Sequence, residues 1–317
     1  MKKYLIILLL SVSFSSFGQQ IALNSQYLFN EMMVNPGATG AKDYIPIQFN
    51  FRKQWVNFPG SPTTQFLSGH AAVSKKMGFG GSLFNDVAGP SRRTGINING
   101  AYHLQLDANN DHRLGMGLGV SLTQHLIDVN QMETYLPDDP AVLRGYNNTM
   151  VPDANFGIFY HFKDKAFAGI SAYNLGEINR DLYNFETAFS NPLVRTYYLI
   201  GGYHFKVSKN LGIKTTVLGQ AIETGTWQAD GTALFTYKKL LWIGASYRHT
   251  DAVVFLAGGQ AGPVRFGYAY DYTLSDIGQY SVGSHEIFLE LQLTRAKSES
   301  SSKTPWLKRN RVYQPRI

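Results

Sequence analysis

The clearest alternation of hydrophobic and polar positions along the chain lies in residues 284–294. Successive side chains of a β-strand point to opposite faces of the sheet, so a strict two-residue period predicts a strand with two unlike faces. Such a strand fits a sheet that has lipid on one side and water on the other. One face carries His285, Ile287, Leu289, Leu291 and Leu293, and the other carries Glu286, Glu290 and Gln292.

The same period returns over most of the chain, in segments of about ten residues each. A sheet between lipid and water must close on itself, because hydrocarbon offers no partner to the backbone groups of an open edge. The expected fold class is therefore all-β, a closed antiparallel transmembrane β-barrel of about 14 strands. The predicted strands cover residues 45–53, 63–73, 77–86, 92–106, 113–124, 151–162, 165–174, 194–206, 211–222, 226–237, 240–249, 252–261, 263–273 and 284–294.

The connections between these strands alternate in length. The connections after even-numbered strands are short, whereas several after odd-numbered strands are long, including 54–62, 125–150 and 175–193. Short periplasmic turns and long extracellular loops produce this order in outer-membrane barrels. It predicts an integral outer-membrane protein with both termini in the periplasm. A soluble β-sandwich also alternates, but it does not require fourteen strands joined in this order.

In the segment 113–124, glycine and serine occupy every second position, at 115, 117, 119 and 121. Apolar residues fill the alternate positions, so the small residues are expected to face the lumen. Small residues on that face either leave room inside the barrel or let another stretch of backbone approach closely.

The chain ends define the expected domain organisation. Residues 1–18 have a basic start, a short apolar run and small residues before Gly18, which is typical of a cleaved signal peptide. The apolar run is shorter than the about 20 residues of a spanning helix. Residues 19–44 form an N-terminal periplasmic or plug-like segment, 45–294 the barrel, and 295–317 a basic periplasmic tail. Within the plug-like segment, residues 27–33 could form a short helix that ends before Asn35-Pro36, and a disordered linker is the alternative.

The charge is concentrated at the C-terminal end. The whole chain has a net charge of +7, and residues 295–317 contain seven basic residues and one acidic residue. An exported protein has little access to nucleic acid, so the tail is expected to be solvated, or to dock on an acidic periplasmic partner or on lipid headgroups. The residues expected to dock are Trp306, Lys308, Arg309 and Arg311.

Enzymatic chemistry has little support in the sequence. There is no cysteine, which excludes disulfides and thiolate metal sites. The eight histidines are scattered, and no Gly-x-Ser-x-Gly or His-Glu-x-x-His motif accompanies them. We therefore expect no enzyme, no catalytic residue, no metal and no cofactor.

Several motifs follow one another in a fixed order and resemble the PorP/SprF family, outer-membrane proteins associated with the type IX secretion system of Bacteroidota. The motifs are QYLFNEMMVNP at 26–36, FRKQW at 51–55, FPGSPTTQ at 58–65, GSLFNDVAGP at 81–90, RTG at 93–95, NGAYH at 99–103 and GSHE at 283–286. The resemblance spans most of the mature chain. Two departures are the sequence NPGATG at 35–40, where the family usually has NPAYAG, and the tail beyond Thr294.

The resemblance implies a barrel that retains or anchors secreted cargo proteins with a C-terminal sorting domain at the cell surface. It also implies contacts with periplasmic and lipoprotein components of the secretion machinery and with outer-membrane lipid, and for some members a part in gliding motility. The candidate contact residues for partner or cargo are Asn35, Pro36, Arg52, Lys53, Trp55, Phe58, Thr64, Gln65, Asn85, Asp86 and Arg93. A passive porin or a transporter of hydrophobic solutes, with an open lumen, is the alternative function.

Physical arguments leave two roles open for several of these residues. Arg52 and Lys53 could bind a cargo carboxylate, or pair with headgroups or loop carbonyls at the rim. Trp55 and Phe58 could stack on a partner, or lie in the aromatic belt at the membrane interface. Asn85-Asp86 offers too few ligands for a cation and is interpreted as an Asx-type turn, as is Asp138-Asp139-Pro140.

Overall fold

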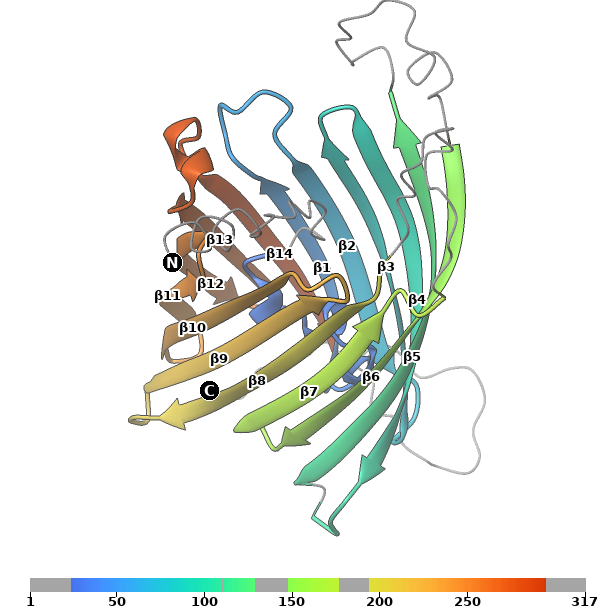
Figure 1. The fold of residues 1–317 in the computed structure, drawn as a ribbon. Coiled ribbons are helices and arrows are strands. Elements are labelled where there is room, and N and C mark those ends of the chain that lie inside the picture. Colours follow the sequence, from blue (N-terminus) through green and yellow to red (C-terminus); the bar gives the residue numbers. More distant parts are fainter. Residues whose placement is uncertain (1–23, 110, 129–147, 177–193, 295–317) are drawn as a thin grey trace, which may run out of the picture.

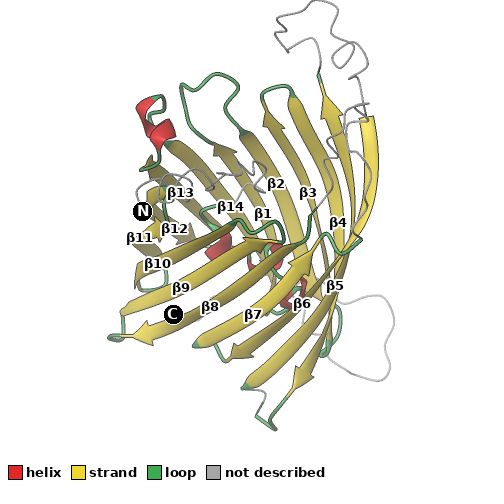
Figure 2. Ribbon diagram, viewed as in Figure 1, coloured by secondary structure: helices red, strands yellow, loops and turns green. Residues whose placement is uncertain are grey.

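The computed structural model describes residues 24–109, 111–128, 148–176 and 194–294. Within these residues, fourteen strands form a single closed antiparallel barrel (Figures 1 and 2). The strands are β1 (Tyr44–Lys53), β2 (Thr63–Ala72), β3 (Met77–Ala88), β4 (Ser91–Gln105), β5 (His112–Ile127), β6 (Asn148–Phe162), β7 (Ala166–Tyr173), β8 (Thr196–Lys206), β9 (Leu211–Ile222), β10 (Trp227–Tyr237), β11 (Leu241–Arg248), β12 (Ala252–Ala261), β13 (Val264–Thr273) and β14 (Ser284–Thr294).

Each strand pairs with its neighbours in the sequence, and the first strand pairs with the last. β1 and β14 run antiparallel with Ile47 opposite Leu291 and Arg52 opposite Glu286, which closes the sheet. This order leaves no exposed sheet edge, so the strand backbone is hydrogen-bonded on both sides around the barrel. The predicted closed fourteen-strand barrel is confirmed.

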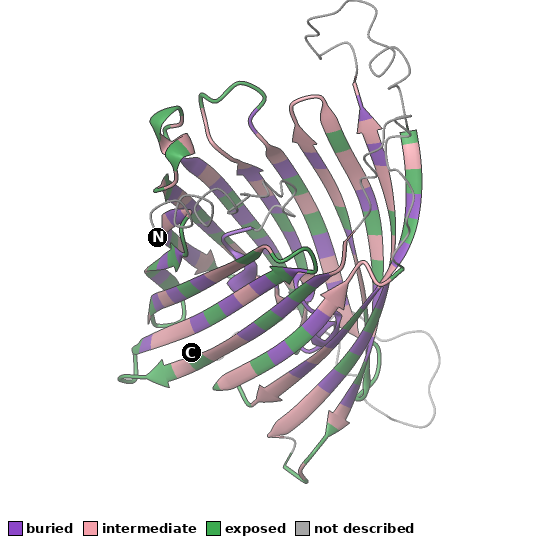
Figure 3. Cartoon of the chain, in the orientation of Figure 1, coloured by how far each residue is buried: buried purple, intermediate pink, exposed green. Residues whose placement is uncertain are grey.

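The two faces of the barrel have opposite chemistry. Large apolar side chains such as Leu118 and Ile243 are 66% and 65% exposed on the outside, whereas lumen-facing Gln48 and Glu286 are fully buried. The alternation appears as stripes along every strand in Figure 3. An apolar exterior around a buried polar interior is the reverse of a soluble protein, and it requires lipid on the outside.

A stretch of chain that we call the inner segment, residues 24–43, lies within the barrel (Figures 1 and 2). It contains three 3-10 turns, η1 (Tyr27–Phe29), η2 (Glu31–Met33) and η3 (Pro36–Ala38). The single helix predicted for residues 27–33 is wrong, because Asn30 at φ −131° and ψ 70° leaves helical geometry between η1 and η2. A fourth 3-10 turn, η5 (Asp276–Gln279), follows β13.

Apolar residues on one side of the lumen form a core with the inner segment. The lumen faces of β6 and of β8 to β13 supply buried apolar side chains, and the inner segment supplies apolar residues from η1, Val34 and Ala38. This burial stabilises the packed segment, since removing apolar area from water gains about 25 cal/mol per Å². The core consists of Tyr27, Leu28, Val34, Ala38, Phe159, Tyr198, Ile200, Leu218, Leu234, Trp242, Val254, Leu256 and Ala269.

The glycines of β5 accommodate the backbone of the inner segment. A Cβ atom on Gly117 would overlap the carbonyl group of Pro36, and one on Gly115 would overlap the carbonyl oxygen of Gly37. Of the two roles that the sequence left open for these small residues, close backbone approach is the one seen at both positions.

The structure also corrects one local interpretation and leaves others outside its reach. Asn85 and Asp86 lie inside β3 rather than in an Asx-type turn. The signal peptide, the basic tail and Asp138-Asp139-Pro140 lie outside the described residues. Within the described residues, no helix is long and apolar enough to cross a membrane.

Candidate functional site in the barrel lumen

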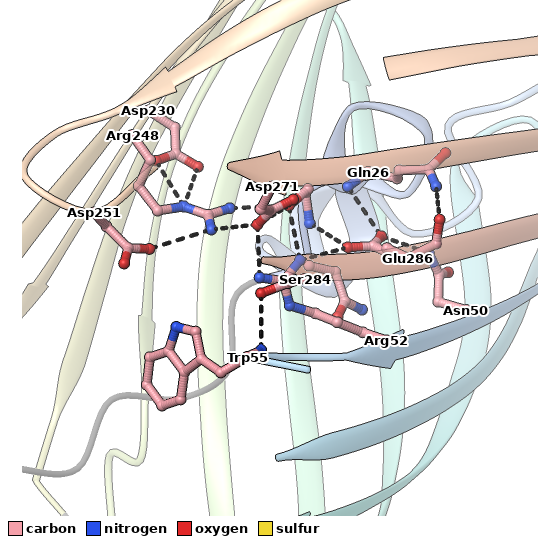
Figure 4. Close-up of polar contacts among 12 residues, drawn as sticks. Gln26, Asn50, Arg52, Trp55, Asp230, Arg248, Asp251, Asp271, Ser284 and Glu286 are labelled. Atoms are coloured by element: carbon pink, nitrogen blue, oxygen red, sulfur yellow. Dashed lines mark hydrogen bonds and ion pairs between the residues drawn. The ribbon is translucent and has the colours of Figure 1, made fainter. Parts of the chain in front are cut away.

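Two buried arginines and three buried carboxylates form a cluster inside the barrel, drawn in Figure 4. Arg52 of β1 is 2% exposed, and its guanidinium lies 2.7 Å from Asp271 of β13 and 3.3 Å from Glu286 of β14. Arg248 of β11 reaches the same Asp271 oxygen at 2.9 Å and Asp230 of β10 at 3.3 Å. Buried charges are tolerated when they are paired and hydrogen-bonded, and each arginine here meets at least two carboxylates.

Ser25 of the inner segment lies at the centre of this charge cluster. Its hydroxyl donates to Asp271 at 3.0 Å and accepts from Arg52 at 2.9 Å and from Arg248 at 3.1 Å. One donated and two accepted bonds are all that a hydroxyl can make. The cluster therefore engages the Ser25 hydroxyl in every hydrogen bond that this hydroxyl can make.

Glu286 fixes the backbone of the inner segment as well. Its carboxylate accepts the backbone N–H of Ser25 at 2.6 Å and that of Gln26 at 3.1 Å. The same carboxylate accepts from Asn50 at 3.2 Å and from Arg52. Four donors on one fully buried carboxylate tie the inner segment to β1 and β14.

A second set of contacts holds the inner segment around η3. The side-chain amide of Asn35 donates to the carbonyls of Ile158 and Ile170, while its oxygen accepts the N–H of Gly37. His103 of β4 contacts the Thr39 carbonyl at 2.8 Å. Asn35 is fully buried, so its role is to position the inner segment against β6 and β7.

An acidic residue of the inner segment meets two lysines near the short turns. Glu31 lies 3.3 Å from the ammonium of Lys42 and 3.8 Å from that of Lys214 on β9. Burial raises the pKa of the Glu31 carboxyl, but the two ammonium groups outweigh it and lower that pKa to about 2. Glu31 is therefore ionised at neutral pH and bridges the segment to the barrel wall.

A basic cavity of about 450 Å³ opens at the end of the barrel that carries the short connections. We call this end the short-connection mouth. Its lining includes Arg113, Lys165 and Lys239 from strand ends and short turns, together with Lys42 and Lys214. Positive side chains gathered in one concave site raise the local concentration of anionic groups.

A smaller cavity of about 180 Å³ lies in the other half, among the strand ends that carry the long connections. We call it the outer cavity. Asn24 and residues 32–34 of the inner segment contribute to its lining. Strands β2 to β8, together with Asn174 directly after β7, contribute the rest, including Arg93, His125, Asp153 and Tyr198.

Charge is distributed unequally between the two halves of the described barrel. The half at the short connections has twelve basic and six acidic residues, and the half at the long connections has six basic and nine acidic residues. The basic residues of the first half are Lys42, Lys75, Lys76, Arg113, Lys163, Lys165, Lys206, Lys209, Lys214, Lys238, Lys239 and Arg265, and its acidic residues are Glu31, Asp43, Asp107, Asp111, Asp164 and Glu290. The second half has Arg52, Lys53, Arg92, Arg93, Arg195 and Arg248 against Asp86, Asp128, Asp153, Glu223, Asp230, Asp251, Asp271, Asp276 and Glu286.

The structure brings three of the predicted contact residues together. Thr64 donates to Asp86 at 2.7 Å, and Arg93 pairs with the other oxygen of that carboxylate. All three line the outer cavity. Gln65 and Asn85 face the outside of the same strands and are separate from the outer cavity.

The remaining predicted residues are dispersed. Arg52 does not lie free at the rim, because its guanidinium is buried among the barrel's own carboxylates. Lys53 donates to the carbonyl of Ser61, the loop pairing considered as its alternative role. Trp55 is half-buried at φ 47°, and Phe58 is 38% exposed in the connection after β1. The tail candidates Trp306, Lys308, Arg309 and Arg311 lie outside the described residues.

Sequence reasoning missed the partners of Arg52. Glu286 lies directly opposite Arg52 once β1 pairs with β14, and both side chains face the lumen. The available signal was the requirement that the first and last strands of a closed barrel pair. Within the described residues, no group of three histidine or acidic side chains is placed to hold a metal ion.

Comparisons with known proteins relate the chain to one family. The family described as "Type IX secretion system membrane protein PorP/SprF" matches residues 16–291. Comparison with curated proteins gives no match.

Several solved structures are similar to the chain over most of its length. They include the outer membrane protein Omp33 of Acinetobacter baumannii, with 9% identity, 80% of this chain and 100% of that chain covered, and a TM-score of 0.46. A FadL homologue of Pseudomonas aeruginosa has 10% identity, coverage of 87% and 94%, and a TM-score of 0.46. The toluene transporter TbuX of Ralstonia pickettii has 8% identity, coverage of 83% and 93%, and a TM-score of 0.47. Neither the identities nor the TM-scores of these likenesses assign a function.

Proposed function

The chain belongs to the PorP/SprF family of type IX secretion system membrane proteins, and on this premise we propose that it retains secreted cargo at the cell surface. The cargo is a secreted protein with a C-terminal sorting domain, such as an adhesin. The barrel sits in the outer membrane and links the cargo to periplasmic and lipoprotein components of the secretion machinery. Its role is one of binding rather than of catalysis.

The occupied lumen is the observation that favours retention over a passive pore. Ser25 and Gln26 are bound to a fully buried carboxylate, and Asn35 is bound to two strands on the opposite wall. An open porin has a water-filled channel in this position. The inner segment thus acts as a plug, and cargo is held at the mouths rather than passed through the lumen.

The two mouths suit two kinds of contact. The long connections face the cell surface, where cargo is held, and the short turns face the periplasm. β14 ends at the short-connection mouth. We propose that the basic tail, which follows β14 in the sequence, lies in the periplasm. Asn24 lines the outer cavity, in the half that carries the long connections. The periplasmic position of both termini stays a prediction.

Affinity purification of the tagged protein from its native envelope in mild detergent tests the proposal. We expect a large secreted protein and type IX components to copurify, identified by mass spectrometry. A barrel that purifies alone and conducts ions steadily in a planar bilayer would be a porin, and the proposal would be wrong.

Deletions test which part of the chain retains cargo. We expect a variant without residues 26–40, or without residues 295–317, to release cargo into the medium while the barrel still assembles. Heat-modifiable migration on gels verifies assembly in each variant. Cargo that stays on cells after both deletions would show that neither segment is needed for retention.

A further inference from the structure

The outer cavity contains more hydrogen-bond acceptors than the protein uses. One oxygen each of Asn24, Asn97 and Asp153 is buried and has no partner among the described residues. Neither ring nitrogen of His125 is hydrogen-bonded there, and in the neutral ring one of them is an acceptor and the other a donor. His125 is 3% exposed and Asp153 is 8% exposed. A buried polar group without a partner is costly, so these side chains call for water or a bound molecule in the outer cavity, and the unpartnered oxygens favour a molecule that donates hydrogen bonds.

The other walls of the outer cavity favour a positive charge. Phe66, Phe84, Tyr173 and Tyr198 supply aromatic rings, whose faces attract cations. The pair of Arg93 with Asp86 is neutral as a unit, so Asp153 leaves the lining with one net negative charge. The surrounding half of the barrel has nine acidic and six basic residues, which adds to the attraction.

The size of the outer cavity limits what it can hold. Its volume of about 180 Å³ is below the roughly 300–1,000 Å³ of pockets that hold drug-sized molecules. It accommodates one long side chain, or on the order of ten water molecules when empty of ligand.

From these observations we infer that the outer cavity binds one lysine or arginine side chain of the retained cargo. The stem of that side chain lies against the aromatic rings, and its ammonium or guanidinium group donates to Asp153 and to the unpartnered amide oxygens. This inference deepens the proposed function, because it names the chemistry by which the surface half recognises its partner.

Side-chain analogues test the outer cavity in the purified full-length protein. Nα-acetyl-lysine amide and Nα-acetyl-arginine amide carry the cation, and Nα-acetyl-norleucine amide has a comparable stem without it. Binding is measured by ligand-observed saturation-transfer NMR in detergent, with empty micelles as a blank. We expect both cationic analogues to bind at least tenfold more tightly than the norleucine analogue.

Two variants locate the binding. Asp153→Asn keeps an acceptor for the N–H groups of Ala154 and Gly176 but removes the charge, and we expect at least tenfold weaker cation binding. Ser121→Leu fills the outer cavity and should abolish binding. The matched control is Asp276→Asn, which removes the same charge from an exposed site of the same half and should change binding less than twofold.

Equal binding of the norleucine analogue, or an undiminished affinity in Asp153→Asn, would overturn the inference. No binding of any analogue would overturn it too, and would mean that the outer cavity holds water only. The comparison of analogues on the unmodified protein stands even if a variant fails to fold. Cargo that copurifies although no analogue binds would leave the proposed function intact and refute only the role of the outer cavity.

Discussion

Replacing Glu286 by alanine should release the inner segment while leaving the barrel closed. The substitution removes the acceptor of four hydrogen bonds, from the backbone of Ser25 and Gln26 and from the side chains of Asn50 and Arg52. Removing one partner of a buried ion pair costs about 3–5 kcal/mol, because the remaining groups stay buried and unpaired. The strand backbone makes none of these bonds, so the barrel should stay closed. Two of the bonds hold Ser25 and Gln26 directly, and a third orients Arg52, which itself donates to Ser25, so most of the cost should fall on the docking of the inner segment.

This loss corresponds to a rise of about two to four orders of magnitude in the population of the undocked segment. Hydrogen exchange followed by mass spectrometry measures it directly, since amides that exchange through local opening report the free energy of that opening. We expect faster exchange at residues 25–42, unchanged exchange in β5 and β9, and new ion conductance in a planar bilayer. The control is Glu223→Ala, which removes a half-exposed carboxylate 3.8 Å from Arg195. Unchanged exchange in the inner segment of Glu286→Ala would refute this reasoning.

Two further predictions concern the same segment. Gly117→Val should weaken docking of the inner segment by about 1–3 kcal/mol, because the added Cβ meets the backbone of Pro36, and hydrogen exchange in that segment should become faster. The control is Gly231→Val, whose Cβ meets nothing within 4 Å and which should leave hydrogen exchange in the inner segment unchanged. The folded-state pKa of Glu31 is about 2, below its ordinary 4.5, so its contribution to stability is present above pH 4.5 and is lost as the pH falls towards 2. Thermal unfolding should show this loss, and Glu31→Gln should remove that part of the pH dependence.

The two-residue period was sufficient to predict the fold, because a barrel with unlike faces imposes that period on every strand. The predicted bounds of the last strand, 284–294, are those of β14. The prediction was poorest around the connection of β5 and β6. β5 continues to Ile127 and β6 begins at Asn148, each three residues beyond its predicted limit. In the extension of β5, His125 and Ile127 are buried and Leu126 lies between them, so the strand pattern itself continues past the predicted limit.

The candidate site was harder to predict because its contacts join distant parts of the chain. Alternation indicates that Arg52 faces the lumen, but not which carboxylates it meets there. Asp271 and Glu286 are 219 and 234 residues away in the sequence and become neighbours only when the barrel closes. The inner segment has no two-residue period, so its path through the lumen follows from the shape of the wall, including the glycines of β5.

The distribution of charge between the two ends of the barrel also could not be predicted from the sequence. The total of +7 and the basic tail drew attention to one end of the chain, and the remainder was near neutral. Folding separates that remainder into a basic half at the short connections and an acidic half at the long ones. Because the strands alternate in direction, residues of one sign that are dispersed in the sequence gather at one mouth. Such a separation agrees with the proposal that a cationic group binds in the outer cavity, and it makes the short-connection mouth complementary to anionic groups.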